Sequence, residues 1–125
     1  MLDSILQLIP HAHVGFIGLR REETTLRAMF YHKSLPKNLG RFETILIDPM
    51  LATGGSSVAA IDLLIAQGAK NIRLVNLVAA PAGIRTVRKH YPRVPVFTAA
   101  VDEKLNGRGF ILPGLGDAGD RLFGT

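Results

Sequence analysis

The chain has 125 residues and no cysteine, with 47% hydrophobic and 20% charged residues and a formal net charge of +5 at pH 7. This composition excludes disulfides, thiolate metal sites and a cysteine nucleophile, and it favours a single folded domain over residues 1–125. No apolar run approaches the roughly 18 residues of a membrane span, and Met1–Ser4 lack the basic-then-apolar order of a signal peptide, so we expect a cytoplasmic protein without a membrane partner.

The N-terminal third predicts a helix followed by a small β-arm. The helix is indicated by apolar residues at helical spacing before Pro10, namely Leu2, Ile5, Leu6 and Ile9. Residues 12–19 predict a strand, residues 20–23 a charged loop, and residues 27–33 a second strand with mixed faces. Residues 35–40 predict a connection.

The rest of the chain alternates strands and helices. Helices are predicted over 56–67, where Gly68 ends the segment, and over 81–91, where Pro81 begins it. Strands are predicted over the apolar runs 44–48, 71–79, 94–101 and 110–112. This alternation predicts an α/β fold with a parallel sheet flanked by helices. Because Ile45, Leu46 and Ile47 are consecutive apolar residues, we expect the strand at 44–48 to be buried on both faces. Residues 113–125 predict a glycine-rich tail.

The segment after the strand at 44–48 carries the strongest functional signal. A strand that runs into a glycine-rich turn and then opens a helix is typical of phosphate sites, because the helix N-terminus presents N–H groups to an anion. Gly54 and Gly55 let the backbone approach a ligand. A Walker A loop needs a lysine that is absent here, which excludes an ATPase P-loop. Asp48 is placed to accept hydrogen bonds from ribose hydroxyls while the amides of residues 53–57 hold a 5′-phosphate.

Two further segments have candidate roles. Residues 114–119 match the G-x-G-x-x-G pattern of dinucleotide sites. Such a site also requires a helix, a further strand and an acidic residue about 20 positions later, and the residues after Gly119 do not provide them. This glycine-rich loop predicts a pocket lined by backbone groups. Arg20 and Arg21 form a basic pair, whose guanidinium groups suit an anion with several oxygens, and a surface ion pair with Glu22 or Glu23 is the alternative.

The remaining basic and histidine residues favour solvated or turn positions. The positive charge permits either a nucleic acid or a polyanionic small substrate, but the bases form no long tract, and we disfavour nucleic acid. His11 and His13 are spaced for a metal clip, yet no acidic residue accompanies them. We therefore expect a turn there and no metal site formed by the protein.

The segment Asp48–Ser56 resembles the phosphoribosyl pyrophosphate (PRPP) motif of uracil phosphoribosyltransferases nearly letter for letter. The resemblance continues through residues 77–81 and 98–102, and residues 111–125 are similar to the C-terminal signature of that family. It implies a type I phosphoribosyltransferase-like fold with a small β-arm. The implied reaction joins uracil to PRPP, giving UMP and diphosphate, a step of pyrimidine salvage.

The resemblance also implies roles for individual residues. Asp48 and Arg21 are the implied catalytic residues, which orient the ribose hydroxyls and the diphosphate. The implied PRPP-binding residues are Arg21, Asp48, Pro49, Met50, Leu51, Ala52, Thr53, Gly54, Gly55, Ser56 and Asp117. The implied uracil-binding residues are Ile111, Gly116, Asp117 and Ala118. Mg²⁺ is the implied cofactor, held mainly through PRPP.

Members of this family are longer at the N-terminus. The resemblance implies that the N-terminal part of the fold, with a strand and a loop that helps bind diphosphate, is missing from this sequence. We expect a truncated form with reduced or no activity. A missing strand exposes a sheet edge and apolar faces, which favours a homo-oligomer, a dimer or higher. The alternative is a non-catalytic module that keeps the PRPP or nucleotide site for regulation, conceivably with RNA.

Overall fold

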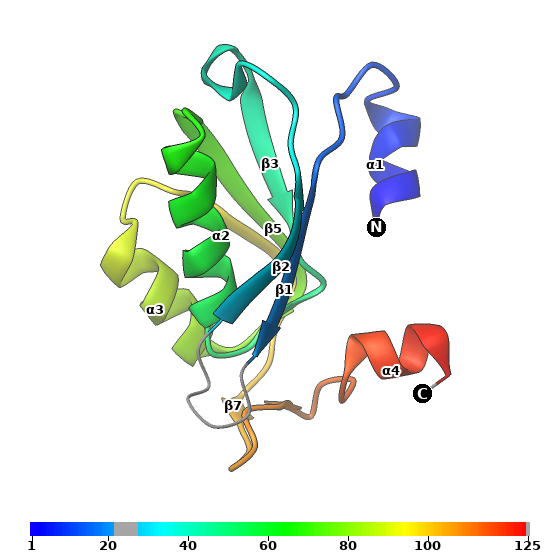
Figure 1. Ribbon diagram of the computed structural model, residues 1–125. Helices are drawn as coiled ribbons and strands as arrows, with labels where there is room; N and C mark the ends of the chain where they lie inside the picture. Colours follow the sequence, from blue (N-terminus) through cyan, green and yellow to red (C-terminus); the bar gives the residue numbers. More distant parts are fainter. Residues whose placement is uncertain (22–27, 125) are drawn as a thin grey trace.

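The structure, a computed structural model, describes residues 1–21 and 28–124, with residues 21 and 28 described by their backbone alone. Its centre is a four-stranded parallel sheet formed by β3 (Glu43–Ile47), β4 (Met50–Leu51), β5 (Asn71–Ala79) and β6 (Val96–Val101). β5 is the central strand, with β6 along one side and both β3 and β4 along the other. The predicted α/β fold with a parallel sheet is confirmed (Figure 1).

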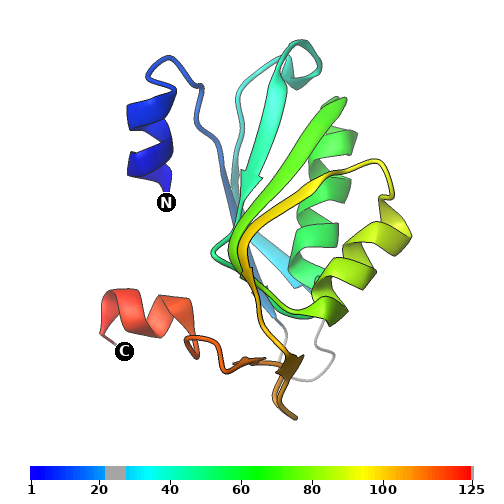
Figure 2. The same cartoon turned by 180° about the vertical axis from the view of Figure 1, so that it is seen from behind.

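Two helices cover one face of this sheet (Figures 1 and 2). α2 (Gly55–Ala66) and α3 (Pro81–His90) confirm the helices predicted there, and Gly68 follows α2 with a φ of 92°. Between the helices and the sheet lies an apolar core whose largest fully buried side chains include Leu51, Ile61, Leu74 and Val87. Among the described residues, no helix has both the length and the apolar character needed to cross a membrane.

β3 and β4 run along the same edge of β5 and are separated by Asp48 and Pro49. The pairing register with β5 is the same on both sides of this break. Proline has no N–H to donate, and the carbonyl of Pro49 instead accepts from the amides of Leu77, at 3.0 Å, and Val78, at 3.1 Å. The break places Asp48 at the end of β3, as the sequence predicted.

The expectation that this strand is buried on both faces is wrong. In β3, Ile45 is 40% exposed, whereas Leu74 of the central strand is fully buried. The physical reason is that α2 and α3 cover one face of the sheet, while the other face is exposed even in the central strand, where Leu77 is 44% exposed.

The arm and the first helix lie outside this two-layer unit. β1 (Phe16–Arg21) and β2 (Ala28–Ser34) form an antiparallel pair, which confirms the small β-arm. β1 starts later than predicted and includes Arg20 and Arg21, which were expected in a loop. α1 (Leu2–Leu8) lies on the side of the sheet away from α2 and α3 (Figure 2).

The C-terminal segment contains more structure than the predicted tail. β7 (Lys104–Leu105) pairs antiparallel with β8 (Ile111–Leu112), and a short helix, α4 (Ala118–Phe123), follows. α4 begins because the side chain of Asp117 caps it, accepting from the amide of Asp120 at 3.0 Å. No residue of α4 is buried, so local capping is what the described contacts provide for it.

Candidate functional site

The segment that joins β3 to α2 surrounds a small cavity at the carboxyl end of the sheet. The cavity has a volume of about 170 Å³ and is lined by Asp48, Met50, Ala52, Thr53, Gly54, Ser56 and Ser57. A carboxylate, hydroxyl groups and the first turn of a helix therefore face one space. Of the other residues predicted in this loop, Pro49 and Gly55 do not line the cavity, and the side chain of Leu51 belongs to the core.

Gly54 is required by the backbone of this loop. Its φ is 88°, in the left-handed region, and a Cβ there would lie 2.9 Å from the carbonyl oxygen of Gly83 and 2.9 Å from the Cβ of Thr86. Gly54 is also the N-cap of α2 and provides no side chain to cap the first-turn amides. These amides lie at the positive end of the helix dipole, which is where a phosphate binds.

Close packing of α3 fixes the outer side of the loop. A Cβ on Gly83 would lie 2.6 Å from the carbonyl oxygen of Ala52, so the helix backbone rests directly on the loop. Gly55 differs, because the nearest atom to a Cβ placed there is 3.9 Å away. The two adjacent glycines therefore have different roles. Gly54 allows close packing against α3, and Gly55 leaves space beside the N-terminus of α2.

Asp48 is held at the break between β3 and β4. Its amide donates to the carbonyl of Val75 at 3.1 Å, and its Oδ1 accepts from the amide of Met50 at 3.2 Å. Burial raises the pKa of the Asp48 carboxyl, and the hydrogen bond from Met50 acts in the opposite direction. A desolvated carboxylate is a strong acceptor, so it suits hydroxyl donors such as those of a ribose.

The structure places the predicted uracil-binding residues away from this cavity. Ile111 has a buried side chain, so its backbone is the part that can face a ligand. Gly116 and Asp117 are exposed, and Ala118 begins α4. None of the four lines the small cavity. The loop around the small cavity follows the carboxyl end of β3, and the C-terminal segment follows that of β6. These two strands lie on opposite sides of β5.

Arg21, the predicted diphosphate ligand, is the last residue of β1 and pairs with Ala28. Its side chain lies outside the described part of the chain, so its role stays a prediction. Among the described residues, no group of at least three His, Cys, Asp or Glu side chains is placed to hold a metal ion.

Comparison with known proteins decides the family. The family model for uracil phosphoribosyltransferase matches residues 1–125, the whole chain. This chain belongs to the uracil phosphoribosyltransferase family. Curated uracil phosphoribosyltransferases from Clostridioides difficile and Paracoccus denitrificans are 56% and 57% identical to it over 125 residues. The chain spans 60% and 59% of their respective lengths.

A solved structure shares the fold of this chain. The AQ2163 protein from Aquifex aeolicus superposes with a TM-score of 0.89 at 39% sequence identity, over 98% of this chain and 59% of that one. The shared fold therefore extends over nearly the whole chain.

Sequence reasoning missed two polar residues that this uracil phosphoribosyltransferase fold places beside the predicted loops. Asn76 donates from Nδ2 to the carbonyl of Asp48 at 2.7 Å. Asp102, just after β6, accepts from the amide of Gly114 at 2.9 Å, while its own amide donates to the carbonyl of Ala79 at 2.9 Å. The available signal was a polar residue within or directly after an apolar strand.

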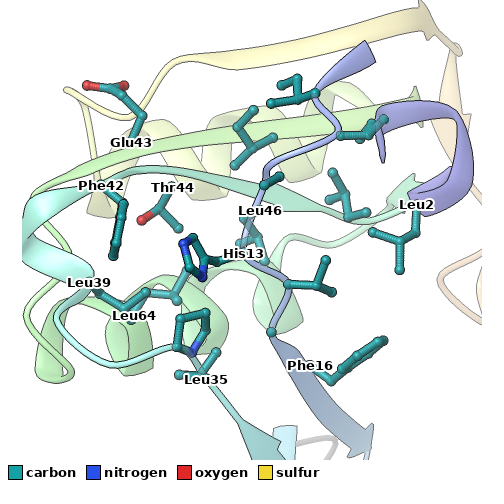
Figure 3. A pocket seen from close by; sticks show the side chains of 18 of the residues that line it. Leu2, His13, Phe16, Leu35, Leu39, Phe42, Glu43, Thr44, Leu46 and Leu64 are labelled. Carbon is teal, nitrogen blue, oxygen red and sulfur yellow. The ribbon is translucent and has the colours of Figure 1, made fainter. Parts of the chain in front are cut away.

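A second cavity is larger and chemically different. It has a volume of about 640 Å³ and lies between α1, β3 and the start of the arm, with mostly apolar side chains around it (Figure 3). His13 packs on Phe42 with ring centroids 5.1 Å apart. The Oγ1 atom of Thr44 is buried without a hydrogen-bond partner among the described residues. This lining does not suit a polyanionic substrate of the uracil phosphoribosyltransferase family.

Proposed function

We propose that this chain binds PRPP at the small cavity and, with uracil, forms UMP and diphosphate. The observation that carries the proposal is the convergence of Asp48 and the first turn of α2 on one cavity of about 170 Å³. Relatives that carry the name uracil phosphoribosyltransferase, such as that of Dictyoglomus thermophilum at 54% identity, support it.

The proposed reaction is a displacement at the anomeric carbon of PRPP. A ring nitrogen of uracil forms the new bond and loses its proton, while the bond from the anomeric carbon to the diphosphate oxygen breaks and its electron pair leaves with diphosphate. Charge develops on the ribose and on the leaving group, so positioning and electrostatics supply most of the catalysis. We assign the ribose hydroxyls to Asp48, the 5′-phosphate to the amides of residues 53–57 and the diphosphate to Arg21.

The residue assignments follow the predicted motif. We propose that PRPP is bound by Arg21, Asp48, Pro49, Met50, Leu51, Ala52, Thr53, Gly54, Gly55, Ser56 and Asp117. We propose that uracil is bound by the backbone around Ile111 and by Gly116, Asp117 and Ala118. A buried side chain at Ile111 is compatible with this, because the pyrimidine edge would be matched by main-chain donors and acceptors.

We propose Mg²⁺ as the cofactor, held mainly through PRPP. The lining of the small cavity offers one carboxylate, that of Asp48, and this fits a cation that takes most of its oxygen ligands from substrate and water. When bound, Mg²⁺ would neutralise charge that develops on the leaving diphosphate.

We further propose that the chain binds PRPP but forms UMP more slowly than its longer relatives. Turnover requires uracil and PRPP to be held together, and the chain spans 60% of the length of the relative from Clostridioides difficile. The lack of cysteine is compatible with a reducing compartment, and we propose the cytoplasm.

The test combines binding with turnover. Calorimetry with PRPP and Mg²⁺ should detect binding, and UMP formation should be measured beside the relative from Clostridioides difficile as a positive control. UMP formation below that of the control supports the proposal. PRPP binding without any UMP, or salt-sensitive RNA binding, favours the non-catalytic module, and absence of PRPP binding overturns the assignment.

We also propose a homo-oligomer, on separate grounds. Among the described strands, β3 pairs on one side only, and beside it Phe16 and Ile45 are 57% and 40% exposed. An unpaired edge next to apolar surface favours association with another copy. Sedimentation equilibrium should give a mass above 13.5 kDa, and a monomer at all concentrations contradicts this proposal.

A further inference from the structure

Asn76 is a buried polar residue in the central strand of the sheet. It is 2% exposed, and Leu74 on the same strand is fully buried. Placing an amide side chain in such an environment is costly unless its donors and acceptors are matched. A polar residue at this position therefore needs an explanation other than packing.

The hydrogen bond that Asn76 makes falls at the break in the neighbouring strand. Its Nδ2 donates to the carbonyl of Asp48 at 2.7 Å. A carbonyl oxygen only accepts, so the orientation of the amide group is fixed by this contact. The amide of Leu77 donates to Pro49 instead, which leaves the Asp48 carbonyl to the side chain of Asn76.

The Oδ1 atom of the Asn76 amide indicates that this residue is not explained by fold stability alone. Its Oδ1 is buried and has no hydrogen-bond partner among the described residues. An unmatched buried acceptor cancels much of what the bond to Asp48 contributes. An apolar side chain of similar size would pack in the same strand without that cost.

We propose that Asn76 is a positioning residue for Asp48. Asn76 holds the main chain at the end of β3, where proline interrupts the hydrogen-bond ladder. It thereby sets the direction in which the side chain of Asp48 points. This role deepens the proposed function and rests on it. The ligand whose binding depends on Asn76 is the one that presents ribose hydroxyls to Asp48.

The direct test is Asn76→Leu, studied by calorimetry and by thermal unfolding. We expect affinity for PRPP with Mg²⁺ to fall about tenfold or more, since small displacements at a binding site carry penalties of this order. The unfolding temperature should change little, because the variant removes the unmatched Oδ1 but leaves the carbonyl of Asp48 without its donor. Asn71→Leu, on the exposed start of the same strand, should leave PRPP affinity unchanged.

A second pair of ligands separates positioning from general damage to the loop. Ribose 5-phosphate carries both the hydroxyls and the phosphate, whereas inorganic phosphate needs only the amides of α2. In Asn76→Leu, affinity for ribose 5-phosphate should fall while that for inorganic phosphate is kept. An equal loss of both would show a structural role and overturn the proposal.

The remaining outcomes are also decisive. If Asn76→Leu does not fold, Asn76→Thr replaces it, since threonine suits a strand and its hydroxyl is too short to replace the amide. Unchanged PRPP affinity in the folded variant overturns the positioning role and leaves the proposed function intact. A wild-type chain that does not bind PRPP overturns the proposed function and this role with it.

Discussion

The two cavities described above differ in size and in chemistry, and the smaller one has the more polar lining. The one between α1 and β3 has a volume of about 640 Å³ and a mostly apolar lining, while the one at the end of β3 has about 170 Å³ and is lined by Asp48, hydroxyl groups and a helix N-terminus. A phosphorylated sugar needs donors, a positive dipole end and a carboxylate. In this fold the smaller cavity offers them, so its chemistry and not its volume supports it as the proposed site.

The two cavities also differ in how the chain builds them. The small one is formed by a contiguous stretch, residues 48–57, whose backbone is fixed by Gly54 and by close packing of α3. The large one is formed by elements far apart in the sequence, α1 and β3, which do not close on each other and leave Ile45 partly exposed. We therefore expect substitutions at the small cavity to change ligand binding, whether or not they change stability, and those at the large one to change stability alone.

The largest expected effect comes from Gly54→Ala. A methyl group there combines a left-handed φ of 88° with contacts of 2.9 Å to Gly83 and Thr86. Strain and overpacking together should lower the free energy of unfolding by about 2–5 kcal/mol. PRPP binding should become undetectable in calorimetry, because the displaced loop carries the first turn of α2.

Gly68→Ala is the matched control for this prediction. Its φ of 92° is similar, but a Cβ there meets nothing within 4 Å. Its free energy of unfolding, measured in urea, should fall only by the cost of backbone strain, about 1–2 kcal/mol. Its PRPP affinity should be unchanged. If the two variants behave alike, the contact between α3 and the loop does not shape the small cavity.

Asp48→Asn should have the next largest effect. Charge-assisted hydrogen bonds contribute about 1.5–3 kcal/mol each, so losing the charge opposite two ribose hydroxyls should weaken PRPP binding about a hundredfold. The amide oxygen of asparagine can still accept from Met50, so the fold is expected to persist. Unchanged affinity in calorimetry would remove Asp48, and with it the small cavity, from the proposed site.

The same variant carries a stability signature in pH. Since burial raises the pKa of Asp48, the folded chain holds this proton more tightly than the unfolded chain. Its stabilising contribution is present below the ordinary pKa of an aspartate and is lost as pH rises through the raised value. The free energy of unfolding of wild type relative to Asp48→Asn should therefore decrease over that window, as measured by urea titrations at several pH values.

The part of the site that could be predicted from sequence is the part that the chain builds locally. Asp48, Gly54 and Ser56 are close together in the sequence, so a strand, a turn and a helix start suffice to bring them to one cavity. The alternation of apolar strands and amphipathic helices likewise predicted β5 and α3 with correct bounds or nearly so. Hydrophobic periodicity is strongest for such elements.

The parts that could not be predicted depend on neighbours distant in the sequence. The exposure of Ile45 arises because the helices cover the other face of the sheet, which the apolar residues of β3 do not reveal. Asn76 and Asp102 gain their roles only when parallel strands align β3, β5 and β6, because each contacts a residue many positions away. α4 depends on a capping contact of Asp117 in a segment that is mostly glycine and polar residues.

Asp102→Ala should sharpen the distinction between the two substrates. The carboxylate of Asp102 accepts a hydrogen bond from the amide of Gly114. Position 114 requires glycine, because its φ is 46° and a Cβ there would lie 2.1 Å from the carbonyl oxygen of Ile111. Without this acceptor the proposed uracil segment loosens, and affinity for uracil should fall about tenfold, the effect of one lost hydrogen bond to a charged group. Affinity for PRPP should fall less than affinity for uracil, because Asp117 is the single proposed PRPP residue in that segment and does not line the small cavity.

Asp102→Asn is the matched control, since its side-chain oxygen can still accept from Gly114. It should retain most of the uracil affinity, measured by equilibrium dialysis with PRPP present. A loss equal to that of Asp102→Ala would indicate that the charge, and not the hydrogen bond, is what matters. A fall in PRPP affinity as large as that in uracil affinity would mean that the two loops act as one site.

The smallest effect is expected at the large cavity, from Thr44→Val. The two side chains have nearly the same shape, but valine removes the buried hydroxyl oxygen that has no partner among the described residues. The free energy of unfolding should rise by about 1 kcal/mol in urea titrations, because an unmatched polar atom is replaced by an apolar one. PRPP affinity should not change. If it does, the apolar cavity influences the proposed PRPP site, and the division between a binding cavity and a packing cavity fails.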